Sequence, residues 1–278
     1  MPELPEVETV RRAILPELES RRVASARICH PRTARRHARC TDVEDRLVGR
    51  RVLRVGRLGK FLLIGLDAGL TWVMHLGMSG RILLCRPGDP KEVHTRFWAE
   101  MESGPLLRLV DPRTFGFVAV FTPEELDGST LARLGADAWE ELPSTGWLFD
   151  AMRSRTIPVK SLLLDQRFVA GLGNIYSDEV LHRAGIHPSR RSGGLSEEEV
   201  GRIRSEVRPV LAEGISRGGT SLDDLAYLLP DGRAGEFLEY LRVYGREGRP
   251  CRTCESSIRR MVIGARSSFF CPECQIAP

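Results

Sequence analysis

The chain has 278 residues and a mass of 31.1 kDa, with 42% hydrophobic and 28% charged residues. This composition is typical of a globular protein and excludes a mainly disordered chain, and the length allows two domains. The longest apolar runs, such as residues 61–66, are far too short to span a bilayer, and no signal peptide is evident. We therefore expect a cytoplasmic protein without a membrane partner.

Positive charge is concentrated in two separate segments, although the formal net charge is only +4. Residues 21–57 carry 12 arginines against 3 acidic residues, and residues 242–278 carry 7 arginines against 3. Residues 121–150, in contrast, carry 7 acidic residues against one arginine. Two separated basic segments favour a polyanion held between two parts of the fold, and solvated surface charge is the alternative.

The first half of the chain predicts a helix followed by antiparallel strands. Apolar residues within 1–20 follow helical spacing. Residues 50–121 alternate in short β-type runs, with hairpin signals at 67–69 and 102–105. This meander predicts a sandwich or a barrel.

The second half predicts helices after the acidic, Pro- and Gly-containing stretch 122–150. Short helices are expected within 157–166 and 174–185, the second closed by Gly185. Ser196 and Glu199 form a capping box for a third helix that runs to about Glu213. The whole chain is therefore expected to be α+β.

Four cysteines near the C-terminus carry the most specific pattern. Two C-x-x-C pairs are separated by 16 residues, which suits one tetrahedral zinc ion held by four thiolates: Cys251, Cys254, Cys271 and Cys274. Such a site leaves no open position, so this zinc is predicted to be structural. The intervening residues are enough for a β-hairpin that presents arginines, among them Arg266. Two disulfides or unligated thiols are the alternatives, and Cys29, Cys40 and Cys85 have no spacing partners.

The N-terminus places two carboxylates, Glu3 and Glu6, beside Pro2. If Met1 is removed, Pro2 becomes a secondary amine that is partly neutral near pH 7 and able to form an imine with a sugar C1′. A neighbouring carboxylic acid can supply a proton. An ordinary helix start rich in Pro and acidic residues is the alternative reading.

A glycine-containing turn, Gly171–Asn174, opens the helix expected at 174–185. Helix N-terminal amides and the Asn174 side chain suit a phosphate group. A plain connection between two helices explains the turn equally well.

Five motifs in order make the chain resemble the bacterial formamidopyrimidine-DNA glycosylase family: PELPEVETVRR at the start, HLGMSGR at 75–81, DPRTFG at 111–116, LLLDQRFVAGLGNIYSDEVL at 162–181 and the four-cysteine finger. The resemblance covers essentially the whole chain. Leu4 favours the branch that acts on oxidised purines, because the endonuclease VIII branch usually has glycine there.

The resemblance implies a fold and a division into domains. Residues 1–135 would form an antiparallel β-sandwich with flanking helices, and 136–150 a linker. Residues 151–238 would form a helix–two-turn–helix domain, and 239–278 the zinc-finger hairpin.

The resemblance also implies a base-excision enzyme with lyase activity. Pro2 would attack C1′ of the damaged nucleotide, Glu3 would act as the acid at the sugar, and Glu6 would position Glu3 or the sugar. Successive β- and δ-eliminations would cut the strand without a catalytic metal. The partner would be double-stranded DNA with oxidised bases or abasic sites, bound by a monomer at the nucleoid.

Further positions carry implied roles at the DNA. Lys60 and Lys160 would lie near the damaged nucleotide, with Lys60 on a phosphate. The remaining assignments are Met78, Arg113 and Phe115 in the gap left by the flipped base, His75, Asn174 and Arg266 on the DNA backbone, and Thr220 on the lesion. Thr220 belongs to a segment, 218–235, that would close over the flipped base.

Three residues depart from the family pattern. Thr114 stands where a second arginine is common, and Glu255 and Ala265 stand where glycine is usual. We expect these changes to alter affinity or lesion preference rather than catalysis.

Three other functions remain open from the sequence. One is an endonuclease VIII-like enzyme for oxidised pyrimidines, and another is a catalytically silent protein that binds damaged DNA. The third, a zinc-ribbon RNA-binding or ribosome-associated protein, gives no reason for the N-terminal PELPE.

Overall fold

The computed structural model describes residues 1–222 and 227–277, which form two compact units. Unit 1 comprises residues 1–133 and 214–238, and unit 2 comprises residues 134–213 and 239–278. The domain bounds implied by the resemblance assign residues 214–238 to the helix–two-turn–helix domain. In the structure these residues belong to the same unit as residues 1–133. Among the described residues, no helix is long and apolar enough to cross a membrane.

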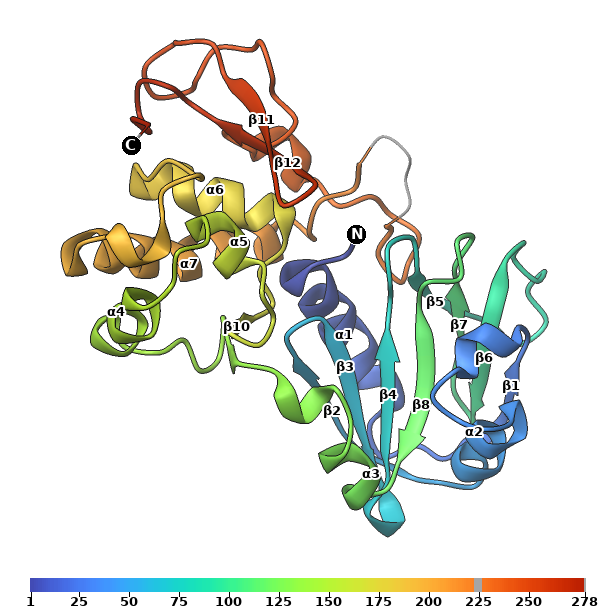
Figure 1. Ribbon diagram of the computed structural model, residues 1–278. Coiled ribbons are helices and arrows are strands. Elements are labelled where there is room, and N and C mark those ends of the chain that lie inside the picture. The colour runs from blue at the N-terminus through green and yellow to red at the C-terminus, as the bar shows by residue number, and fades with distance from the viewer. Residues whose placement is uncertain (223–226, 278) are drawn as a thin grey trace. The chain divides into compact units, whose positions relative to one another are not determined.

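Unit 1 is built from two four-stranded antiparallel sheets (Figure 1). One sheet has the order β2-β3-β4-β8 and the other β1-β6-β7-β5. The strand bounds are β1 (Val23–Ile28), β2 (Val52–Leu58), β3 (Phe61–Leu66), β4 (Thr71–His75), β5 (Arg81–Cys85), β6 (Thr95–Met101), β7 (Leu106–Val110) and β8 (Phe117–Phe121). The predicted sandwich and both predicted hairpins, β3–β4 and β6–β7, are confirmed.

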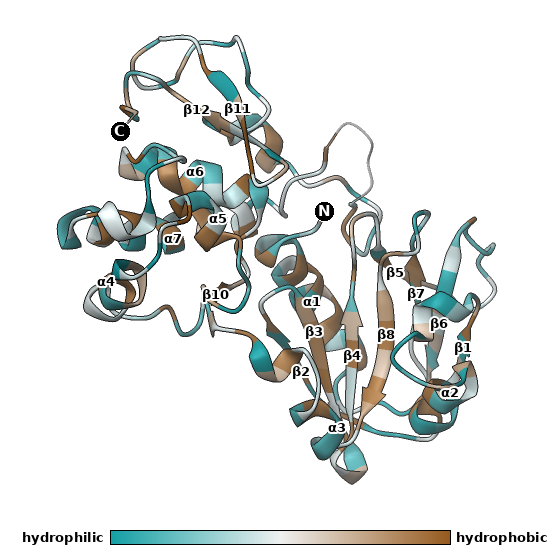
Figure 2. Ribbon diagram, in the orientation of Figure 1, coloured by the Kyte–Doolittle hydropathy of each residue, from teal (hydrophilic) through white to brown (hydrophobic). Residues whose placement is uncertain are grey.

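The core of unit 1 lies between the two sheets and under two helices. Trp72 of β4 meets Phe97 of β6 edge to face, with ring centroids 5.7 Å apart, so side chains of both sheets share one interior. The strands β3 and β8 are mostly brown, and therefore hydrophobic, in Figure 2. The helices α1 (Leu4–Leu18) and α2 (Cys40–Leu47) add their apolar faces to this core, and a short helix, α3 (Pro123–Asp127), follows β8.

Unit 2 holds the helices that the sequence predicted, followed by the C-terminal hairpin. Its helices are α4 (Thr145–Arg153), α5 (Val159–Leu163), α6 (Asn174–Ala184) and all but the last three residues of α7 (Glu197–Ser216), which ends three residues beyond the predicted Glu213. The short strands β9 (Ala136–Asp137) and β10 (Val169–Ala170) pair in parallel, and β11 (Arg259–Ile263) pairs with β12 (Arg266–Phe270). The expected linker, 136–150, contains β9 and the first residues of α4.

A buried carboxylate, Glu8, fixes α1 on the first sheet. Its side chain is only 2% exposed and accepts hydrogen bonds from Arg11 and Arg12 on its own helix, at 2.8 Å each. Arg57, at the end of β2, approaches the same carboxylate to 3.2 Å and donates to the carbonyl oxygen of Gly59. Glu8 therefore connects the N-terminal helix to the turn that precedes Lys60.

Glu8→Gln is expected to destabilise the protein at neutral pH by about 3 kcal/mol, because it leaves a buried guanidinium uncompensated. Burial raises the pKa of Glu8, but the hydrogen bonds and charges of the arginines outweigh it and lower the pKa from 4.5 to about 2. The contribution of this carboxylate is therefore complete above about pH 4.5 and is lost as the pH falls towards 2.

Chemical denaturation of both proteins at several pH values measures this difference. The gap between them should narrow from pH 4.5 downwards. Glu17→Gln is the matched control, because Glu17 lies on the same helix and forms no ion pair within the described part of the chain. A gap that stays constant down to pH 2.5 would contradict this role of Glu8.

Candidate active site and metal centre

The N-terminal residues are buried at the start of α1. Pro2 is buried, and Glu3, the residue that caps the helix, is 2% exposed. The Glu6 carboxylate reaches back within the same turn, and its Oε2 accepts a hydrogen bond from the backbone N–H of Glu3 at 2.7 Å. Pro5 suits the first turn, where its missing N–H costs no helical hydrogen bond. The three predicted residues Pro2, Glu3 and Glu6 are thus held together.

The second oxygen of Glu6 contacts a distant part of the sequence. Glu6 Oε1 accepts a hydrogen bond from the backbone N–H of Thr220 at 2.7 Å. Thr220 follows Gly219, whose φ of +81° and close approach to Glu6 leave no room for a side chain, since a Cβ there would lie 2.8 Å from Oε1. Glu6 therefore links the backbone of the N-terminus to the segment expected to recognise the lesion.

The ends of this segment are fixed by further backbone contacts. Thr220 pairs with Glu236, and Phe237 N donates to Gly219 O at 3.0 Å. The Tyr227 hydroxyl donates to Gly218 O at 3.1 Å and lies 3.4 Å from the carbonyl oxygen of Glu6. Burial and the charge of Glu6 raise the pKa of Tyr227 well above its ordinary value, so the hydroxyl stays protonated. Part of the predicted closing segment, 223–226, lies outside the described residues.

Lys60 and His75 lie at the same end of the first sheet, in the turn before β3 and at the end of β4. Lys60 occupies the tight β2–β3 turn and is 6% exposed, and Phe61 beside it pairs with His75. Burial and the nearby charge of Lys60 lower the pKa of His75 to about 4, so the imidazole is neutral at pH 7. His75 Nδ1 accepts from Gly77 N at 3.1 Å, which places the ring hydrogen on Nε2. His75 is thus a neutral hydrogen-bond donor.

Two loops that carry predicted wedge residues are joined by Asp111. Its Oδ1 accepts from Ser79 Oγ at 2.7 Å, and its Oδ2 accepts from Gly116 N at 2.7 Å. The loop after β4 thereby holds Met78, 41% exposed, and the loop before β8 holds Phe115, 37% exposed. Large apolar side chains left at the surface on braced loops are available to enter a base stack.

Arginines surround the Phe115 loop. Arg35 donates to the carbonyl oxygens of Gly116, at 2.6 Å, and Phe115, at 2.8 Å, so this part of the basic segment 21–57 braces the loop. The Arg113 guanidinium lies 5.3 Å from the Phe115 ring centroid. Thr114 has φ of +57°, a conformation that a β-branched residue rarely adopts.

In unit 2, Lys160 and Asn174 converge on one backbone carbonyl. Lys160 Nζ donates to Ser267 O at 2.9 Å, and Asn174 Nδ2 donates to the same oxygen at 3.0 Å. Lys160 is fully buried and lies 2.7 Å from Asp178, whose pKa is raised by burial against the attraction of this ammonium. The Lys160 side chain therefore holds α6 to β12 and exposes no surface within unit 2 as described.

Arg266 is exposed at the start of β12, next to Ser267. The two finger positions where glycine is usual both have positive φ: +65° at Glu255 and +60° at Ala265. A side chain costs about 1 kcal/mol in this conformation. Glu255 and Ala265 therefore adopt the backbone conformation that glycine would adopt, but at a higher conformational energy.

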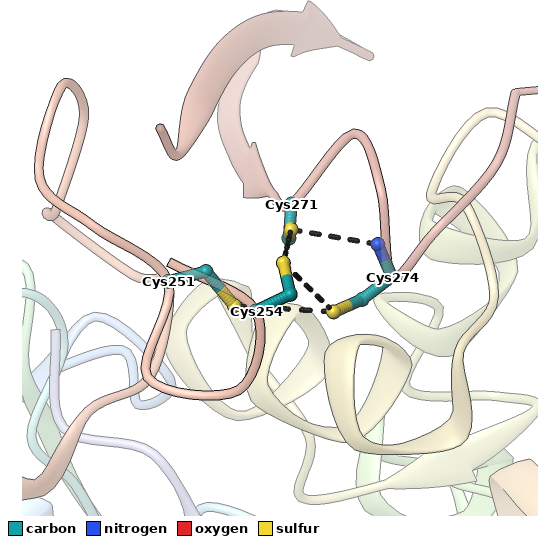
Figure 3. Close-up of side chains that lie close together, drawn as sticks. All are labelled: Cys251, Cys254, Cys271 and Cys274. Carbon is teal, nitrogen blue, oxygen red and sulfur yellow. Dashed lines mark hydrogen bonds between the residues drawn. The ribbon is translucent and has the colours of Figure 1, made fainter. Parts of the chain in front are cut away.

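The four predicted cysteines form one cluster (Figure 3), and their Sγ atoms all lie within 4.8 Å of one another. Cys254 Sγ is 3.3 Å from Cys271 Sγ and 3.5 Å from Cys274 Sγ, and Cys251 Sγ is 3.9 Å from Cys274 Sγ. Tetrahedral zinc with bonds of about 2.3 Å requires sulfur separations of about 3.8 Å. The cluster fits one zinc ion, which confirms the predicted cofactor.

Sequence reasoning missed the buried polar residues that support these groups, among them Glu8, Asp111 and Glu179. Glu179 accepts three backbone N–H bonds from residues 242–244, at 2.8–2.9 Å. A signal existed for Glu8, which lies on the apolar face of α1 with arginines three and four residues later. The three donors to Glu179 are backbone N–H groups, and Asp111 accepts from one backbone N–H and one hydroxyl; backbone donors leave no mark in the sequence.

Comparison with known proteins shows the family to which this fold and these residues belong. Residues 1–118 match the formamidopyrimidine-DNA glycosylase N-terminal domain, 134–225 the H2TH domain of that enzyme, and 248–276 the zinc finger found in FPG and IleRS. Formamidopyrimidine-DNA glycosylase of Pelotomaculum thermopropionicum is 40% identical over 276 residues, 99% of each chain. That of Pseudomonas putida is 42% identical over 99% of this chain and all of the relative.

Solved structures agree in fold. The MutM (FPG) protein of Thermus thermophilus has a TM-score of 0.88 at 39% identity and covers 99% of this chain and 98% of its own. Lactococcus lactis Fpg in complex with DNA containing an abasic site has a TM-score of 0.90 at 29% identity and covers 99% of this chain and 100% of its own. The chain belongs to the formamidopyrimidine-DNA glycosylase family, whose members are zinc-finger DNA repair enzymes.

Gly219→Ala is expected to reduce base excision at least 10-fold, because its Cβ displaces the Glu6 carboxylate. Gly232→Ala is the matched control: its φ is +87°, and a Cβ there has no neighbour within 4 Å. Both variants bear the cost of an unfavourable φ, of about 1 kcal/mol, but only the first disturbs Glu6. Single-turnover excision from a formamidopyrimidine duplex measures the effect, and equal rates in the two variants would contradict it.

Proposed function

We propose that this protein excises oxidised purines, such as 8-oxoguanine and formamidopyrimidines, and cleaves the resulting abasic strand through an imine at Pro2. The observation that carries the proposal is the Glu6 bridge, which holds the backbone next to Pro2 against the segment bearing Thr220. Membership of the glycosylase family supports the same reaction class.

Removal of Met1 makes Pro2 a secondary amine with a nucleophilic lone pair. The nitrogen attacks C1′, the bond from C1′ to the base breaks, and the base leaves with a proton. Glu3 donates a proton to the ring oxygen of the sugar, which opens the ring and gives an iminium ion. The burial of Pro2 and Glu3 keeps competing water away from this step.

The iminium ion then acts as an electron sink for strand cleavage. Loss of a proton from C2′ expels the 3′ phosphate by β-elimination, and a second proton loss expels the 5′ phosphate by δ-elimination. Water hydrolyses the remaining imine and restores the amine. Zinc held by four thiolates has no open position, so its contribution is structural and these steps use the chain's own groups.

Base excision from a duplex requires the damaged nucleotide to leave the stack. Lys60, a buried cation, and His75, a neutral N–H donor, would bind phosphates of the damaged strand from unit 1. Met78, Phe115 and Arg113 would replace the extruded base, and the braces at Asp111 and Arg35 keep their loops in place without DNA. Preformed loops reduce the entropy lost on binding.

Unit 2 would contribute Asn174 and Arg266 as phosphate ligands. We assign Lys160 to positioning, because its ammonium is buried against Asp178 and Ser267 and holds the residues around these ligands. We propose duplex DNA as the substrate and a monomer in the cytoplasm as the form that binds it.

Borohydride trapping tests the proposal. The purified protein is incubated with a duplex containing 8-oxoguanine opposite cytosine, reduced, digested and mapped. We expect a covalent adduct on the peptide that begins at Pro2, and no adduct with undamaged duplex or with a protein that retains Met1.

The outcomes separate the alternatives. An adduct with a thymine glycol duplex but none with 8-oxoguanine would indicate an endonuclease VIII-like enzyme. No adduct with any lesion or abasic site, together with tight DNA binding, would indicate a silent damaged-DNA-binding protein and overturn the proposal.

A further inference from the structure

One face of α6 contacts the zinc finger along most of its length. Asn174, Asp178 and His182 are spaced four residues apart, which places them in one row on the helix. Asn174 bonds Ser267 O, and Asp178 Oδ2 accepts from Phe269 N at 2.9 Å. His182 Nε2 lies 3.5 Å from Cys251 Sγ. The last contact reaches the predicted zinc ligand itself.

His182 is well placed to hold this contact. It is 4% exposed, so water does not compete for its ring, and Cys251 is 2% exposed. A zinc-bound thiolate carries no proton, so only Nε2 can supply the hydrogen between the two atoms. The His182 Nδ1 atom has no hydrogen-bond partner among residues 1–222 and 227–277, which suits a ring whose hydrogen is on Nε2.

The negative charge of a zinc ion with four thiolates is stabilised by hydrogen-bond donors to the sulfur atoms. One Zn²⁺ with four thiolates carries a net charge of about −2, partly inside the protein. Hydrogen bonds to the sulfur atoms disperse this charge, and outer partners of this kind tune metal affinity. Cys251 receives one from Thr253 N at 3.4 Å as well as the one from His182.

We propose that His182 is a positioning residue of the zinc site: its Nε2–H donates to the Cys251 thiolate, strengthens zinc binding and fixes the finger on α6. The bond joins the C-terminal half of α6 to the metal site, while Asn174 begins the same helix. An effect of this hydrogen bond on DNA binding rests on the function proposed above. Its effect on zinc affinity is independent of that function.

The test compares three variants of the full-length zinc protein by competition with a chelator. His182→Phe keeps a ring but removes the donor, and His182→Asn keeps an amide too short to reach the sulfur. Both should weaken zinc binding about 10–100-fold, the range for losing such a partner. His182→Gln can place an N–H near the position of Nε2 and should stay within a few-fold of the parent protein.

His187→Phe is the matched control. His187 is also 4% exposed and packs on the finger, with its ring centroid 4.5 Å from that of Phe270, but its Nδ1 pairs with Ser189 Oγ. This variant should keep parent-like zinc affinity. Parent-like affinity in His182→Phe, or an equal loss in His182→Gln and His182→Phe, would overturn the proposal.

Cobalt substitution supplies a readout that a purely packing role would not move. Loss of the N–H donor makes the thiolate more electron-rich, so the sulfur-to-cobalt charge-transfer band should shift to lower energy in His182→Phe and His182→Asn. It should stay in place in His182→Gln and His187→Phe. An unshifted band in the two donor-free variants would contradict the hydrogen bond, whatever the result of the DNA experiments.

Discussion

A single carboxylate, Glu6, sets the geometry on which the proposed reaction depends. Its two oxygens accept N–H bonds from Glu3 and Thr220, residues 217 positions apart in the chain, at 2.7 Å each. Charge-assisted bonds to a buried carboxylate are strong and leave little freedom on either side. The segment 218–222 is therefore held at the proposed catalytic N-terminus in the structure without DNA, and Gly219 is needed because nothing larger fits against Glu6.

Unit 2 is organised in the same manner, by buried polar residues that accept or donate to backbone. Glu179 fixes residues 242–244, Asp178 fixes β12, and Lys160 shares the Ser267 carbonyl with Asn174. Near the C-terminal end of α6, His182 contacts Cys251 of the zinc site. The zinc finger is consequently an integral part of unit 2. The position of Arg266 depends on the contacts between β12 and α6 as well as on the metal site.

The sequence predicted what is periodic or locally spaced: the apolar face of α1, the hairpins β3–β4 and β6–β7, and the four cysteines. It did not predict contacts such as Glu6 to Thr220 or Asp111 to Gly116, because backbone donors have no sequence signature and a polar residue is expected at the surface. The departures at Thr114, Glu255 and Ala265 were visible as unusual residues. Only the structure shows that all three have positive φ, so that glycine at two of them has a conformational reason.

Hydrogen–deuterium exchange on Glu6→Gln tests most directly whether Glu6 joins the two segments. A glutamine has one carbonyl oxygen, so its amide nitrogen faces an N–H group and one of the two bonds is lost. Removing a bond to a charged group should speed exchange by roughly 10-fold or more at Glu3 or at residues 217–221, while the strands of unit 1 remain protected. Unchanged exchange at both places would contradict the account, because both segments would then hold their place without the Glu6 carboxylate.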